Sequence, residues 1–133
     1  MAVELQVLLG AVLLAAVQLL LYAVPANREI DSAWLAGPRD TPMPGGLSAR
    51  TGRLQRAFQN HIEGLAMFAP AALAAAAAGV STPVTQGAAV AYLAARIVYV
   101  PLYWAGTPWA RSLVWAVGFF ATVALALAAL IQA

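Results

Sequence analysis

The feature that most constrains this chain is its long uncharged stretches, which are interrupted by short segments rich in proline and glycine. No charged residue occurs over residues 5–27 or 64–95, and the second of these stretches is 32 residues long. A helix needs about 20 apolar residues to cross a hydrocarbon core of roughly 30 Å. Stretches of this kind predict membrane-spanning helices rather than the core of a soluble domain.

Helix-breaking residues divide the chain into four predicted spans. The segment Gly79-Val80-Ser81-Thr82-Pro83 splits the second uncharged stretch, which is too long for one helix across a bilayer. Gly106-Thr107-Pro108 separates the last two spans, because proline suits the first position of a helix. We therefore expect one all-α domain over residues 1–133, an antiparallel up-down four-helix bundle in the membrane. Its predicted spans cover about residues 5–24, 54–78, 84–105 and 109–131.

The composition excludes the common soluble classes. Hydrophobic residues make up 63% of the chain and charged residues 9%, against roughly 45–50% and about 25% in soluble domains. A net charge of +2 is not the clustered cationic face that nucleic-acid binding needs. The chain has no cysteine, and its single histidine, His61, has no companion ligands at metal-binding spacing. We expect no metal site and no thiol chemistry from the protein itself.

The positions of the arginines predict an orientation in the membrane. Several flank the long loop over residues 25–52, and Arg111 follows the turn after the third span, whereas both termini and the Gly79–Pro83 turn carry none. By the positive-inside rule, the long loop faces the cytoplasm and both termini face away from it. The arginines in or beside that loop are Arg28, Arg39, Arg50, Arg53 and Arg56.

Polar residues inside the second and third spans recur at helical spacing. They step by three and four, so that each set falls within one stripe on its helix. Charges on such a stripe cost several kcal/mol each when they face lipid, so we expect both stripes to face other helices or a water-filled cavity. The first stripe consists of Arg53, Arg56, Asn60, Glu63 and Met67, and the second of Tyr92, Arg96, Tyr99 and Tyr103.

One acid and one base lie near the predicted midplane of the bilayer. Glu63 is about 13 Å into the second span, and Arg96 is roughly 15 Å from the Gly106 turn, at 1.5 Å of rise per residue. Either charge alone would be uncompensated, so we predict that Glu63 and Arg96 form a buried ion pair or share one network. A purely structural role, holding helices together, accounts for this pair equally well.

The cytoplasmic end of the two stripes brings together cations, an amide and phenols. Guanidinium groups bind carboxylates through two parallel hydrogen bonds, so this group suits a small anionic ligand with several carboxylates or amides. The residues are Arg53, Arg56, Asn60, Tyr99, Tyr103 and Arg111.

Two segments resemble signatures of the MAPEG family, the membrane-associated proteins in eicosanoid and glutathione metabolism. Residues 56–63, Arg-Ala-Phe-Gln-Asn-His-Ile-Glu, match the pattern Arg-Ala-x-x-Asn-x-x-Glu at every fixed position. The segment from Arg96 to Tyr103, followed by Arg111-Ser112, is similar to the second signature. All four spans occur in the family's order, and the chain looks like a bacterial-type member.

The resemblance implies a homotrimer in a bacterial inner membrane, with glutathione bound between subunits toward the cytoplasmic side. By similarity, Arg111 would stabilise the glutathione thiolate, and Ser112 is a second candidate for contact with the thiol. A neighbouring cation favours the thiolate, which is the attacking form. The residues expected to hold the tripeptide are Arg56, Asn60, Glu63 and Tyr103.

The sequence is compatible with two functions of different kinds. The first is a glutathione-dependent transferase or peroxidase that acts on lipophilic electrophiles entering from the bilayer. The second is a non-enzymatic or differently specific membrane protein that binds a lipid or another anionic ligand in the same intersubunit cleft.

Overall fold

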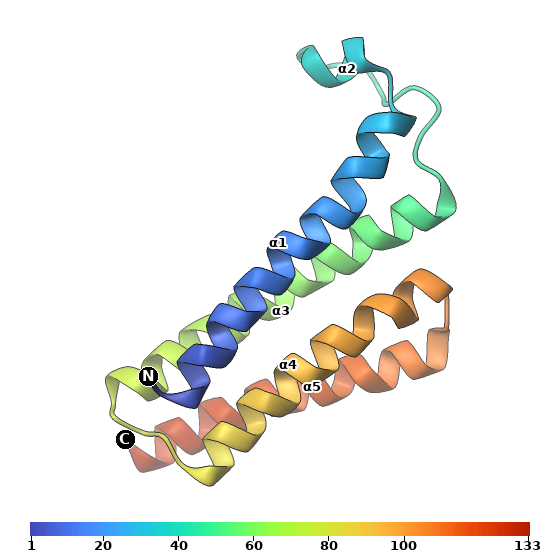
Figure 1. Cartoon of the computed structure of the whole chain (residues 1–133). Helices are drawn as coiled ribbons and strands as arrows, with labels where there is room; N and C mark the ends of the chain where they lie inside the picture. Colours follow the sequence, from blue (N-terminus) through green and yellow to red (C-terminus); the bar gives the residue numbers. More distant parts are fainter.

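The computed structural model of the chain contains five helices and no strands, which confirms the all-α class (Figure 1). The helices are α1 (Val3–Glu29), α2 (Ser32–Ala36), α3 (Ala49–Ala77), α4 (Pro83–Ala105) and α5 (Pro108–Gln132). The short α2 lies within the long loop and was not predicted. Asp31 caps it, because its carboxylate accepts a hydrogen bond from the Trp34 amide at 3.2 Å.

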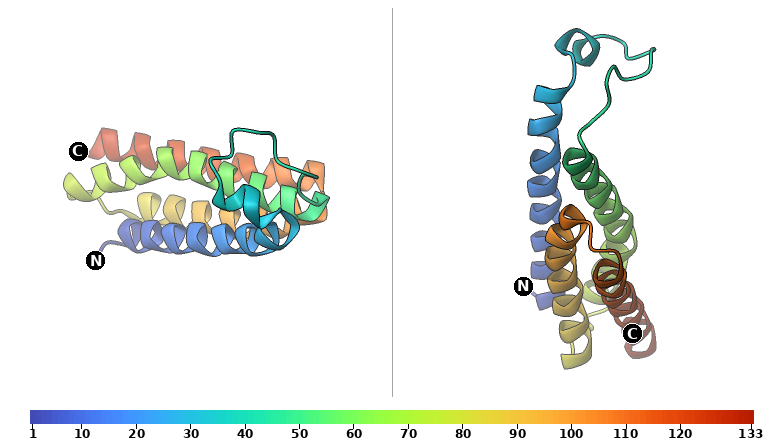
Figure 2. Two further views of the ribbon diagram at one scale, coloured as in Figure 1. Left: turned by 90° about the horizontal axis from the view of Figure 1, so that it is seen from above. Right: turned by 90° about the vertical axis from the view of Figure 1, so that its right-hand side faces the viewer.

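The four long helices form two adjacent pairs. Helix α1 packs beside α3 and α4 beside α5, and α3 also contacts α4 and α5 (Figures 1 and 2). Both termini and the α3–α4 turn lie at one end of the molecule, while the loop with α2 and the α4–α5 turn lie at the other. The two pairs diverge toward the second end, where the arginine-rich start of α3 faces the start of α5.

Three helices, α1, α4 and α5, are long and apolar enough to cross a membrane. Helix α3 is similar in length, but its first half carries Arg50, Arg53, Arg56 and Glu63. A fourth membrane span along α3 therefore stays a prediction.

The predicted breakers do separate helices. Gly106 ends α4 with a φ of 74°, a left-handed conformation that favours glycine. It is also packed tightly, since a Cβ at Gly106 would lie 3.1 to 3.2 Å from the guanidinium atoms of Arg53. At the other turn, Thr82 is the N-cap directly before Pro83, and it forms a capping box with Thr85 at the third position of α4.

Small residues let the long helices approach closely. The core is one cluster of ten buried residues, six of which are alanine, so that helix backbones rather than long side chains meet. Its two largest side chains, Phe68 of α3 and Tyr92 of α4, stack with ring centroids 3.9 Å apart. This stacking holds the middle of α3 against α4 and so sets the distance between their polar stripes.

A glutamate near each end of α1 binds the start of a later helix. Glu4 is fully buried and accepts hydrogen bonds from Ser81 Oγ, at 3.0 Å, and from Thr85 Oγ1. Glu29 accepts from the Ser48 amide at 3.0 Å and from Thr51 Oγ1 at 2.7 Å. A carboxylate at a helix N-terminus is favourable because the helix dipole is positive there.

We predict that Glu4→Ala lowers the free energy of unfolding of the detergent-purified protein by about 1–3 kcal/mol, because it removes the carboxylate to which the buried Thr85 hydroxyl donates. Thermal unfolding followed by circular dichroism measures the effect. Asp40→Ala is the control, since Asp40 is exposed and should change stability by less than about 0.5 kcal/mol. Equal effects of the two substitutions would contradict the role given to Glu4.

Candidate functional site

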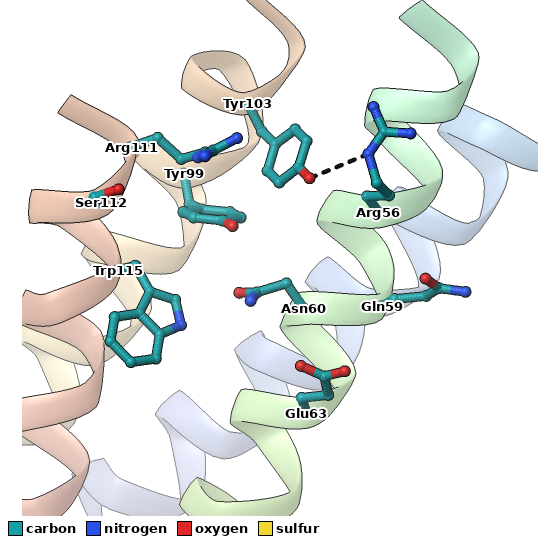
Figure 3. Close-up of a pocket in the computed structure, with 9 residues that line it drawn as sticks. All are labelled: Arg56, Gln59, Asn60, Glu63, Tyr99, Tyr103, Arg111, Ser112 and Trp115. Carbon is teal, nitrogen blue, oxygen red and sulfur yellow. Dashed lines mark hydrogen bonds between the residues drawn. The ribbon is translucent and has the colours of Figure 1, made fainter. Parts of the chain in front are cut away.

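A pocket of about 340 Å³ lies between α3, α4 and α5 at the end that carries the α4–α5 turn (Figure 3). Helix α3 contributes one face of its first half, α4 its last two turns, and α5 its first two turns. Polar side chains dominate the lining, which is unusual within an apolar bundle. The lining residues are Arg56, Gln59, Asn60, Glu63, Tyr99, Tyr103, Arg111, Ser112 and Trp115.

Tyr103 lies between the two guanidinium groups of the pocket. Arg56 Nε donates a hydrogen bond to Tyr103 Oη at 3.2 Å, and the Arg111 guanidinium carbon lies 4.7 Å from the centre of the Tyr103 ring. The Tyr99 ring meets Tyr103 edge-on, with centroids 5.5 Å apart. These contacts hold both cations at the pocket without an ion pair to either, so that their charge is available to a ligand.

The pocket carries two cations and one carboxylate. Glu63 is the only acid among the lining residues, and its side chain is exposed in the single chain. In Figure 3 its carboxylate lies on the α3 side, one turn away from Asn60 and across from Trp115. The arrangement suits a small ligand with more than one negative group and one positive group.

Ser112 lines the pocket, but its hydroxyl proton is already used. Ser112 Oγ donates to the carbonyl oxygen of Pro108 at 3.0 Å, within the first turns of α5. Arg111 has no such internal bond from its side chain and extends toward Tyr103. Of this adjacent pair, Arg111 is the group whose donors are free for an anionic ligand.

The structure brings together most of the residues that the sequence singled out. Arg53 is the exception, because its Nη1 donates to the carbonyl oxygen of Trp104 at 3.3 Å and so caps the end of α4 instead of lining the pocket. The residues that do line it are Arg56, Asn60, Glu63, Tyr99, Tyr103, Arg111 and Ser112.

Two lining residues were not predicted as part of the site. Gln59 lies at the edge of the pocket, and its side chain is directed away from Arg111 in Figure 3. Trp115 stands one turn after Arg111 on the same side of α5. The spacing of four residues from Arg111 was the sequence signal that could have placed Trp115 in the site. An indole ring in an apolar helix is, however, also typical of a side chain that faces lipid.

The predicted Glu63–Arg96 ion pair is replaced by a different network. Arg96, buried in α4, donates from Nη1 to Asn60 Oδ1 at 2.8 Å and from Nε to His61 Nδ1 at 3.3 Å. Glu63 points elsewhere because it is two residues, or about 200°, from His61 around the helix. The inner side of α3 passes through Ala57, His61 and Phe68, all fully buried.

This network also defines which atoms of Asn60 and His61 are donors. Since Asn60 Oδ1 accepts from Arg96, the NH₂ group is the part of the amide left for the pocket. Since His61 Nδ1 accepts from Arg96, Nε2 carries the proton and donates to the carbonyl oxygen of Ala11 at 2.8 Å. His61 thereby joins α3 to α1 and serves the structure rather than the pocket.

The sequence of the chain matches a known protein family. The MAPEG family model matches residues 7–131. The chain belongs to the MAPEG family. With three helices apolar enough to span a bilayer, this MAPEG protein is an integral membrane protein. No curated protein and no solved structure matches the chain.

We predict that His61→Phe, which keeps a ring of similar size, lowers the free energy of unfolding by about 1–3 kcal/mol. The substitution removes the acceptor of buried Arg96 Nε and the bond from α3 to Ala11. Thermal unfolding in detergent measures it, with Gln55→Ala, a half-buried residue of α3, as the control. A stability unchanged by His61→Phe would mean that this network does not hold the helices together.

Proposed function

We propose that this MAPEG protein is a glutathione-dependent transferase or peroxidase that acts on lipophilic electrophiles. One observation carries the proposal: residues from three separate helices, in the two segments that resemble the family's signatures, line a single pocket of about 340 Å³. This volume falls within the usual range for small-molecule sites, roughly 300–1,000 Å³.

The charges of the pocket complement those of glutathione. Glutathione carries two carboxylates, one ammonium group and one thiol. Arg56 and the NH₂ group of Asn60 supply donors for a carboxylate, and Glu63 is the acid that an ammonium group would pair with. The residues proposed to bind it are Arg56, Asn60, Glu63, Tyr99 and Tyr103, without a metal ion.

Arg111 is the residue proposed to act on the thiol. It lies in the first turn of α5, where the helix dipole is also positive, and a cation near a thiol favours the nucleophilic thiolate. In the transferase reaction, a carbon–sulfur bond forms as the bond to the leaving group breaks. Ser112 keeps a supporting position, since its oxygen can still accept a hydrogen bond.

The proposal includes a homotrimer of four-span subunits with the pocket at the interface. Glu63, which lines the pocket, and Met67, one turn further along α3, are both exposed in the single chain. A mid-helix carboxylate facing lipid is costly, so a neighbouring subunit or a polar ligand is expected to cover it. In this arrangement the pocket faces the cytoplasm of a bacterial inner membrane, and both termini face away from it.

We predict that glutathione added to the purified protein produces ultraviolet thiolate absorbance, and that Arg111→Ala reduces this absorbance at least tenfold because the stabilising cation is lost. Arg39→Ala is the control, since the Arg39 guanidinium donates to the carbonyl oxygen of Leu35 in the long loop and lies outside the pocket. No thiolate signal and no binding at millimolar glutathione would favour the alternative, a protein that binds a lipid or another anion.

We predict that Glu63→Gln weakens glutathione binding about 10- to 100-fold, the range for losing one charge-assisted hydrogen bond. Calorimetric titration measures the change. An analogue of glutathione without its amino group should bind the two proteins equally, because it has no ammonium group for Glu63. Equal losses for glutathione and for the analogue would contradict the assignment of Glu63 to the ammonium group.

A further inference from the structure

A second, much smaller cavity of about 20 Å³ lies one helical turn deeper in the bundle. Trp115 lines both this cavity and the main pocket and so stands between them. Among the other residues around the small cavity are Tyr92 and Arg96 of α4, Gly64 of α3 and Gly118 of α5. Its volume gives room for one monatomic ion or one water molecule.

Two buried polar groups at this cavity have no hydrogen-bond partner in the protein. They are the hydroxyl of Tyr92 and the Nη2 atom of Arg96. Tyr92 is 1% exposed and Arg96 is 3% exposed, so neither group reaches solvent. Unpartnered buried donors are rare and costly, and two of them on residues that line one small cavity indicate that an acceptor is missing there.

The charge of Arg96 is also uncompensated. Its other hydrogen bonds go to the neutral side chains of Asn60 and His61, and its guanidinium carbon lies 4.6 Å from the centre of the Tyr99 ring. No acid lines the small cavity. A buried cation without a counter-charge is expensive, particularly within a membrane protein.

Two glycines create the space beside these groups. A Cβ on Gly64 would lie 3.6 Å from Tyr92 Oη and 3.8 Å from Arg96 Nη1. A Cβ on Gly118 would lie 3.7 Å from Arg96 Cδ. Both glycines are inside helices, where glycine costs about 1 kcal/mol relative to alanine, so the retained space has a stability cost.

We propose that this cavity binds a single halide ion, chloride, which accepts hydrogen bonds from Tyr92 Oη and Arg96 Nη2 and neutralises Arg96. A full positive charge and two donors favour an anion over a water molecule, whose own protons would need acceptors. The size of the cavity excludes polyatomic anions such as gluconate and the carboxylates of glutathione. The site is therefore distinct from the main pocket and independent of the function proposed for it.

Thermal unfolding of the detergent-purified protein, without glutathione, tests the proposal. The sodium salt is varied from gluconate to chloride or bromide at constant ionic strength. We expect a saturable rise in the unfolding temperature with either halide, on the order of 5 °C at tenfold excess over the dissociation constant. The same stability in halide and in gluconate would overturn the proposal and assign the cavity to water.

Alanine at Gly64 should abolish the halide dependence, since its Cβ takes the space of the ion at ordinary contact distances. Gly87→Ala is the matched control, because a Cβ at this helical glycine of α4 meets no atom within 4 Å. It should retain the full halide-induced rise. A Gly64→Ala protein that keeps the halide dependence of the unsubstituted chain would refute the location.

Tyr92→Phe gives a test that does not depend on filling the cavity. It removes one of the two donors and leaves the ring that stacks on Phe68. Line broadening of the chloride NMR signal measures binding directly, and we expect the variant to bind chloride at least fivefold more weakly. Equal broadening by the variant and the unsubstituted protein would contradict coordination by Tyr92.

Discussion

The burial of Arg96 is the constraint on which the rest of this structure depends. A guanidinium group inside an apolar bundle must have its hydrogen bonds made, and those of Arg96 determine the positions of neighbours on two other helices. Asn60 and His61 accept from it, and His61 passes the connection on to the Ala11 carbonyl. One charged side chain of α4 thus positions α3 through direct hydrogen bonds, and it positions α1 indirectly, through His61.

The same interaction separates the two sides of α3. Its inner side, at His61, serves packing, whereas its outer side, at Arg56 and Glu63, remains at the pocket. Asn60 belongs to both, since its carbonyl oxygen is held by Arg96 and its NH₂ group is left for a ligand. A donor fixed by the interior of the bundle is thereby presented beside guanidinium groups that Tyr103 holds, which is how preorganised binding sites are built.

Much of this could be predicted from the sequence, and the failures have physical reasons. Long uncharged stretches and the breakers at Gly79 and Gly106 located the long helices, and helical spacing grouped most of the pocket residues. Spacing gives the direction in which a side chain leaves its helix but not where a long side chain ends, so Arg53 was assigned to the pocket although it caps α4. Depth likewise placed Glu63 and Arg96 at one level but could not show that they face different ways.

A structure of the protein in detergent or in a nanodisc, determined in the presence of millimolar glutathione, would decide whether the pocket binds this tripeptide. We expect one glutathione molecule in the pocket between α3, α4 and α5, with its sulfur facing Arg111 and its ammonium group at Glu63. Glutathione bound elsewhere, or a pocket without it at millimolar concentration, would contradict this assignment.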